Sequence, residues 1–116
     1  MKLWPFQDRR SFPRWRVSIN VMYGTDVELT ATTSLDISEH AISIYARTPY
    51  PAGQVLQLHI ASNADQELIT VKAKVVRSAS GIMVLEFLNL QKKDLAQLGC
   101  YLRDLHQAGR SELIGV

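Results

Sequence analysis

The chain has 116 residues, of which 47% are hydrophobic and 21% are charged. This length and balance predict one globular domain with its own core, and they exclude a chain that is disordered throughout. No segment approaches the ~20 consecutive apolar residues of a membrane span, so we expect no membrane insertion. The first ten residues, MKLWPFQDRR, lack the apolar stretch of a secretory signal, and a single cysteine excludes an internal disulfide. These features together favour a cytoplasmic location.

The charge is distributed unevenly along the chain. The net charge is only +2, yet residues 1–16 contain five basic residues and one acidic residue, nearly all of the basic ones arginine. Arginine presents a planar fork of donors that suits phosphate groups and guanine edges. A long nucleic acid normally needs a wider basic surface, so this local cluster indicates a small anionic ligand. The alternative is a solvated terminal segment with no ligand.

Alternating hydrophobic and polar residues predict a series of short strands. Six strands are expected, over residues 17–22, 27–35, 42–47, 56–60, 69–75 and 82–88. Turn-forming residues separate them, including two prolines at residues 48–53 that cannot donate to a sheet. Six short antiparallel strands favour a small closed barrel, because closure leaves no exposed sheet edge.

After Asn89 the spacing of hydrophobic residues becomes helical. The apolar stripe consists of Leu95, Leu98, Leu102 and Leu105. It predicts a helix that covers an open end of the barrel, with contact to a partner helix as the alternative. The predicted organisation is a single domain with an arginine arm at about 1–16, a barrel at about 17–90, a helix at about 91–107 and a loose tail at 108–116.

Signals of catalysis and metal binding are weak. The three histidines, His40, His59 and His106, fall on a loop, a strand and a helix without the spacing of metal ligands. Cys100 has no adjacent base to activate it and is expected to act as a small apolar side chain. The chain also lacks a glycine-rich phosphate loop and a nucleophile elbow. We therefore expect a binding protein and not an enzyme, with no metal and no cofactor.

Two short motifs carry the binding signal. The first is RSFPR at residues 10–14, where two arginines in an extended segment can reach anionic or guanine groups from one side. The second is LDISEHA at residues 35–41, where the strand alternation stops. Asp36 can accept hydrogen bonds from guanine N–H groups, and the Ser38 hydroxyl can both donate and accept. The alternative for both Asp36 and Ser38 is a purely local role in a turn.

These motifs, in their order and spacing, resemble those of the PilZ domain family. The segments KVVR at residues 74–77 and VLEFLNL at residues 84–90 resemble the strands before the family's closing helix, and the resemblance covers roughly residues 8–107. It implies an all-β fold with one C-terminal helix, a six-stranded antiparallel split β-barrel, in agreement with the strand pattern. It also implies a receptor for the bacterial second messenger cyclic di-GMP, in which no bond is made or broken.

The resemblance implies a role for each motif residue. Arg10 and Arg14 would hold guanine faces and phosphates, Arg9 would be an auxiliary cation, and Asp36 and Ser38 would read the guanine edge. Ordering of the N-terminal segment would then change a contact with a protein partner in motility, pilus, biofilm or polysaccharide machinery. The sequence leaves that partner undefined, and it leaves open whether the chain is a monomer or a homodimer.

One position departs from the family pattern. The second motif ends in glycine, where this chain has Ala41, and the preceding residue is His40. An alanine in left-handed geometry costs roughly 1 kcal/mol, and its methyl group can crowd the base, which predicts weaker binding. The alternative is that Ala41 is simply the first inward-facing residue of the third strand. This departure supports an alternative function, a PilZ-fold adaptor that binds no nucleotide and acts through protein contacts.

Other residues near the arginines have two interpretations each. The aromatic residues Trp4, Phe6 and Trp15 are expected to anchor the arm to the barrel, with stacking on a base as the alternative. Arg16 is either a further ligand cation or a solvated strand position. Nucleotide binding requires that the arginine arm and the Asp36–Ser38 bend converge on one patch outside the barrel.

Overall fold

The computed structural model describes residues 13–114, and within this range it contains eight strands and one helix. The elements in chain order are β1 (Arg14–Val17), β2 (Asn20–Gly24), β3 (Leu29–Ile37), β4 (Ala41–Tyr45), β5 (Val55–Ala61), β6 (Leu68–Ala79), β7 (Ile82–Phe87), α2 (Lys92–Gln107) and β8 (Ser111–Ile114). No helix in residues 13–114 is long and apolar enough to cross a membrane.

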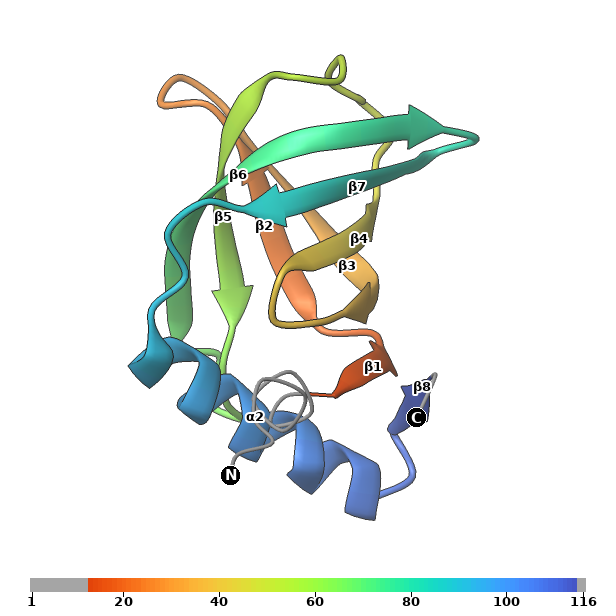
Figure 1. Cartoon of the computed structure of the whole chain (residues 1–116), viewed down its shortest axis with the longest axis vertical. Coiled ribbons are helices and arrows are strands. Elements are labelled where there is room, and N and C mark those ends of the chain that lie inside the picture. The colour runs from red at the N-terminus through yellow and green to blue at the C-terminus, as the bar shows by residue number, and fades with distance from the viewer. Residues whose placement is uncertain (1–12, 115–116) are drawn as a thin grey trace, which may run out of the picture.

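The six-stranded antiparallel barrel with a C-terminal helix is confirmed. Neighbouring strands pair in the order β2-β5-β6-β7-β4-β3, and β2 pairs back with β3 to close the ring (Figure 1). Two further strands extend the sheet outside the ring, since β1 pairs with β3 and β8 pairs with β1. Both lie at the end of the barrel that is close to α2 (Figure 1).

Alternation along the strands fills the barrel with branched aliphatic side chains. The fully buried residues of the strands include Ile42, Ile44, Leu58, Ile60 and Leu85. Helix α2 lies across the lower end of the barrel in Figure 1 and adds Leu98, Leu102 and Leu105 to the same core cluster. The leucine stripe therefore covers the barrel end, as expected.

The first predicted strand is divided into two. Strand β1 begins at Arg14, inside the segment expected to be the arginine arm, and the ladder is interrupted at Ser18 and Ile19 before β2 starts. Trp15 of β1 is only 2% exposed, and its ring meets that of His106 edge-on at 5.5 Å. Trp15 thus anchors the end of the arm, as expected, whereas Trp4 and Phe6 lie outside the described residues.

The expectation of a loose tail at residues 108–116 is wrong for residues 111–114, which form β8. This strand pairs with all of β1, from Arg14 opposite Ile114 to Val17 opposite Ser111. The chain reverses after α2 because Gly109 has φ +75° and the Arg110 amide donates to the Leu105 carbonyl at 2.7 Å. This left-handed glycine cap aims the following residues at the free edge of β1.

Strand β3 contains a β-bulge that changes which residues face the core. Its register against β4 shifts between Ser34 and Asp36. Before the bulge Ser34 is buried while Leu29 is exposed, and after the bulge Ile37 is buried. The alternation at residues 27–35 correctly indicates a strand, but its apolar residues do not line the core. An inserted residue moves all following side chains to the opposite face.

Candidate functional site

Arg14 and Asp36 meet on the outer surface of the barrel. Strands β1 and β3 pair so that Trp15 lies opposite Ile37 and Arg16 lies opposite Asp36. Because Trp15 and Ile37 face the core, the residues next to them along each strand face outward. The Arg14 guanidinium donates from Nη2 to Asp36 Oδ2 at 3.1 Å, with side chains that are 57% and 21% exposed. Two motif residues that are distant in sequence are therefore in direct contact.

Ser38 closes the bend that follows Asp36. Its hydroxyl oxygen accepts hydrogen bonds from the amides of His40 and Ala41, both at 3.2 Å. The Ser38 amide donates to the Ala41 carbonyl at 2.8 Å. In this structure the Ser38 hydroxyl therefore has the local turn role, and it fixes the backbone path between β3 and β4.

Ala41 is the first residue of β4 and pairs with Glu86 of β7. The non-glycine residues with positive φ within residues 13–114 are Gln66 and Ser80, so Ala41 is not left-handed. The expectation of backbone strain at Ala41 is therefore wrong, because this residue starts an ordinary strand. The side chain of His40 is 74% exposed, and its Nε2 lies 3.6 Å from Glu39 Oε1.

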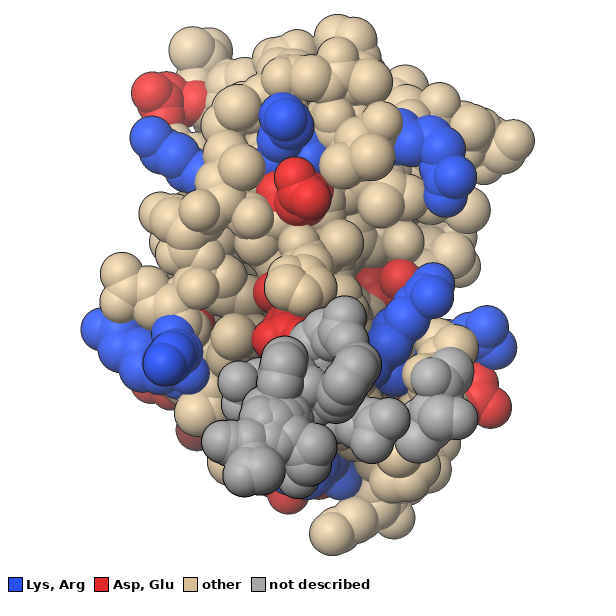
Figure 2. Space-filling model, in the orientation of Figure 1, with Lys and Arg blue, Asp and Glu red and all other residues tan. Residues whose placement is uncertain are grey.

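A second ion pair lies beside the first. Arg16 Nη1 donates to Glu112 Oε1 at 3.2 Å, and these residues are opposite each other in the β1–β8 register. Basic and acidic side chains are interspersed at the lower right of Figure 2, where Figure 1 places β1 and β8. Two arginines of β1 are thus paired with carboxylates from β3 and β8, so these four side chains have no net charge.

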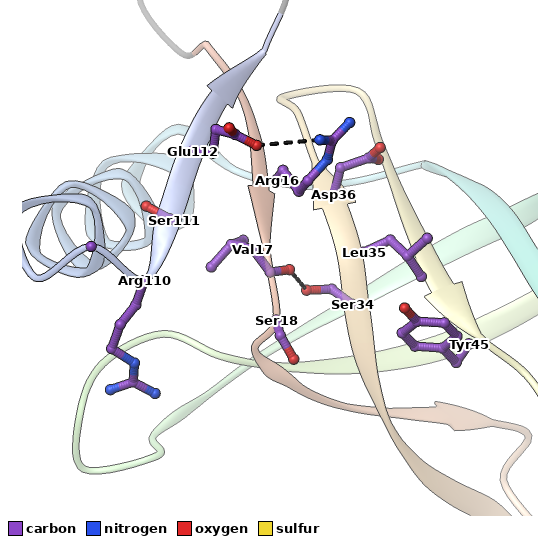
Figure 3. Close-up of a pocket in the computed structure, with 11 residues that line it drawn as sticks. Arg16, Val17, Ser18, Ser34, Leu35, Asp36, Tyr45, Arg110, Ser111 and Glu112 are labelled. Carbon is purple, nitrogen blue, oxygen red and sulfur yellow. Dashed lines mark hydrogen bonds and ion pairs between the residues drawn. The ribbon is translucent and has the colours of Figure 1, made fainter.

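A surface pocket of about 660 Å³ adjoins the two ion pairs. Arg16, Asp36 and Glu112 lie together at one end of it, and Tyr45 stands on the β4 side (Figure 3). Arg110 lies at the other end, in the loop between α2 and β8. The pocket therefore combines cations, carboxylates and one half-exposed aromatic ring in an open groove.

The remaining sequence-based candidates are placed as follows. Arg9 and Arg10 lie outside the described residues, so the arm is observed only from its end at Arg14. Cys100 is exposed, and its Sγ lies 3.7 Å from Arg103 Nη2. No group of three or more potential metal-binding side chains occurs within residues 13–114.

Sequence patterns assign no role to Glu112 and leave that of Arg16 open. Arg16 shares its strand face with Arg14, and this parity was the available signal. For Glu112 the sequence contains no such signal, because the position of this residue beside β1 depends on the reversal of the chain after α2.

Comparisons with known proteins agree with this architecture. MotI (DgrA) of Bacillus subtilis, an inhibitor of motility, superposes with a TM-score of 0.67 at 24% identity, over 85% of this chain and 52% of its own. The PilZ domain of YcgR from Escherichia coli, solved with c-di-GMP, superposes with a TM-score of 0.63 at 16% identity, over 88% of this chain and 95% of its own. MrkH of K. pneumonia, solved as a complex with c-di-GMP, superposes with a TM-score of 0.62 at 20% identity, over 87% of this chain and 54% of its own.

These identities establish a shared fold, and the chain spans about half the length of MotI and MrkH. No curated protein matches the sequence significantly. The family model described as PilZ domain, however, matches residues 8–104, which is most of the chain. With its closed barrel and its C-terminal helix, the chain belongs to the PilZ domain family.

Proposed function

We propose that this chain is a non-catalytic receptor for cyclic di-GMP, which binds outside the barrel where β1 meets the bend after β3. The observation that carries the proposal is the 3.1 Å contact between Arg14 and Asp36. It brings the end of the arginine motif and the start of the Asp36–Ala41 motif to one patch. Cyclic di-GMP presents two phosphates and two guanines, and arginine and carboxylate side chains match these groups.

Each motif residue has a role in this proposal. Arg10 and Arg14 hold phosphates and guanine faces, with Arg9 as an auxiliary cation. Asp36 accepts hydrogen bonds from the guanine edge, while Ser38 fixes the bend and offers its hydroxyl. Ala41 borders the site, and its methyl group limits how closely a base can approach. The solved complexes of YcgR and MrkH, which contain c-di-GMP in proteins of the same fold, support the choice of ligand.

The ligand would have to displace the contact between Arg14 and Asp36. That contact is accessible, since the arginine side chain is 57% exposed. Exposed ion pairs contribute about 0–1 kcal/mol, so the ligand gives up little by separating them. In exchange Arg14 gains a phosphate or a guanine face, and Asp36 accepts hydrogen bonds from guanine N–H groups that are charge-assisted because the carboxylate is ionised.

The output of binding would be a changed protein contact. Binding through Arg10 and Arg14 would fix the residues before β1 against the barrel and alter the surface next to β8. A partner that recognises this surface only in its nucleotide-bound form, or only in its free form, would then respond to the nucleotide. We propose such a partner in motility, pilus, biofilm or polysaccharide machinery.

Calorimetric titration of the full chain with cyclic di-GMP tests the proposal. We expect saturable binding, and Asp36→Asn should weaken it by about 1–3 kcal/mol, or roughly five- to 150-fold, because guanine donors lose their charged acceptor. Asp65→Asn, in the exposed loop before β6, is the matched control and should bind like wild type. Arg14→Ala should remove most of the affinity, whereas Arg103→Ala on α2 should not.

Two results would contradict the proposal. Absence of heat with protein and ligand at about 100 μM would exclude a receptor of useful affinity, for which the free energy of binding exceeds about 5 kcal/mol. Equal affinities of wild type and Asp36→Asn would remove Asp36 from the site. Asp36→Asn and Arg14→Ala should both keep the thermal midpoint of wild type, because surface substitutions usually change stability by less than about 0.5 kcal/mol.

The second candidate function is an adaptor that binds protein and no nucleotide. The observation in its favour is that the Ser38 hydroxyl is already used by the amides of His40 and Ala41. The two cations of β1 are also already paired. A folded chain without affinity for the nucleotide, but with a protein captured specifically by wild type and not by Arg14→Ala, would support it.

A further inference from the structure

We propose that Arg16 is an additional anion-binding residue of the nucleotide site, and that Glu112 competes with the ligand for it. The inference rests on the proposed function, since it assigns further residues to the same site. Its central observation is that β8 delivers a carboxylate from the C-terminal end of the chain to a cation on β1.

Arg16 occupies the middle of a three-strand arrangement. In the β1–β3 register it lies opposite Asp36, and in the β1–β8 register it lies opposite Glu112. Since Asp36 is engaged by Arg14 at 3.1 Å, Arg16 contacts Glu112 at 3.2 Å instead. The two arginines share the outward face of β1, so a ligand that reaches Arg14 and Asp36 is also next to Arg16.

The surface around Arg16 has room for part of a nucleotide. Arg16, Asp36 and Glu112 stand at one end of the pocket of about 660 Å³ (Figure 3). The side chains of Arg16 and Glu112 are 67% and 66% exposed, so an incoming phosphate can reach the guanidinium without any movement of the backbone. A phosphate at this point would replace Glu112 as the partner of Arg16.

Charge explains why the replacement is favourable. Among the described residues, Arg14 and Arg16 are paired with Asp36 and Glu112, so these four side chains together carry no net charge toward a dianion. Glu112 makes one contact, through Nη1 of Arg16, whereas a phosphate can take a bidentate contact with the planar fork. Glu112 therefore raises the ligand concentration that is needed for binding but does not prevent binding.

The pairing with Glu112 is not needed to hold β8 in place. Strand β8 forms a four-residue ladder with β1, and the Ser111 hydroxyl donates to the Leu102 carbonyl at 2.9 Å. An exposed ion pair adds little to such a ladder. Substitution of Glu112 should therefore change ligand affinity while leaving the fold intact.

The test is a cycle of variants of the full chain, titrated with cyclic di-GMP at low and at raised salt. Glu112→Gln should bind up to about fivefold more tightly than wild type, and Arg16→Gln about tenfold more weakly. Glu28→Gln, an exposed change in the β2–β3 turn at the far end of the barrel, removes the same charge and should have no effect (Figure 1). The gain from Glu112→Gln should shrink as salt screens the exposed charges.

The double variant separates competition for Arg16 from a general change of charge. With Arg16→Gln present, Glu112→Gln should give no further gain, because the competed cation is gone. Equal gains in both backgrounds, or wild-type affinity for Glu112→Gln, would overturn the inference while the proposed function stands. Absence of binding by every variant would overturn both the inference and the proposed function.

Discussion

Replacement of Ser34 by alanine should destabilise the protein far more than an ordinary serine substitution in a strand. Ser34 is 1% exposed and lies beside the break between β1 and β2. The Ile19 amide donates to its hydroxyl oxygen at 3.1 Å, and the hydroxyl donates in turn to the Val17 carbonyl (Figure 3). One side chain thus satisfies the two backbone groups that the interrupted ladder leaves open.

The expected loss follows from these two groups. A buried donor or acceptor without a partner costs about 1–3 kcal/mol. Ser34 also lines the open pocket, where water can reach part of the space left by the hydroxyl. The free energy of unfolding of Ser34→Ala should therefore be lower than that of wild type by about 2–4 kcal/mol. Since native domains are stable by about 5–15 kcal/mol, this loss is a large fraction of the total.

Urea unfolding followed by circular dichroism measures this loss, with Ser18→Ala as the matched control. Ser18 is in the same break but is exposed, so its substitution should stay within about 0.5 kcal/mol. Ser34→Thr, which keeps the hydroxyl, should recover part of the stability. A loss below about 1 kcal/mol for Ser34→Ala would refute the bridging role of the hydroxyl.

Three further predictions concern the elements around the site. Trp15→Ala should cost about 3–5 kcal/mol in urea unfolding, because it empties a buried position that anchors β1; a loss typical of the surface would contradict this. Gly24→Ala should lower the thermal midpoint far more than Gly53→Ala, since a Cβ at Gly24 would lie 2.0 Å from the Glu28 carbonyl oxygen whereas Gly53 has open space. Ala41→Gly should lower stability by about 0.5–1 kcal/mol, because no left-handed strain is relieved; a higher midpoint would contradict the extended backbone.

Regular parts of the fold could be predicted from local patterns. Strand alternation depends on burial of every second side chain, and the leucine stripe that includes Leu98 and Leu102 depends on burial of one helix face. Strand β8 could not be predicted in this way, because its four residues are a strand only where the edge of β1 is available. The one local signal was Gly109, whose left-handed backbone turns the chain back.

The candidate site was predicted in part for the same reason. The sequence placed Arg14 and Asp36 in two motifs, but their contact depends on the register of β1 against β3, which no local pattern specifies. Arg16 and Glu112 are further apart still, 96 positions in sequence, and meet only through β8. Long-range register is therefore the information that the sequence patterns lacked.

The bulge in β3 connects the stability of the barrel with the chemistry on its surface. In a regular strand Ser34 and Asp36 would face the same side, because residues two apart share a face. The register shift between them leaves the Ser34 hydroxyl inside, where it joins β1 to β2, and turns Asp36 outward to Arg14. It also directs Ile37 into the core opposite Trp15, which fixes the register of β1. Core packing therefore sets the position of Asp36, the carboxylate proposed to bind the ligand. A core variant that removed the bulge would turn Asp36 away from Arg14 without changing either residue.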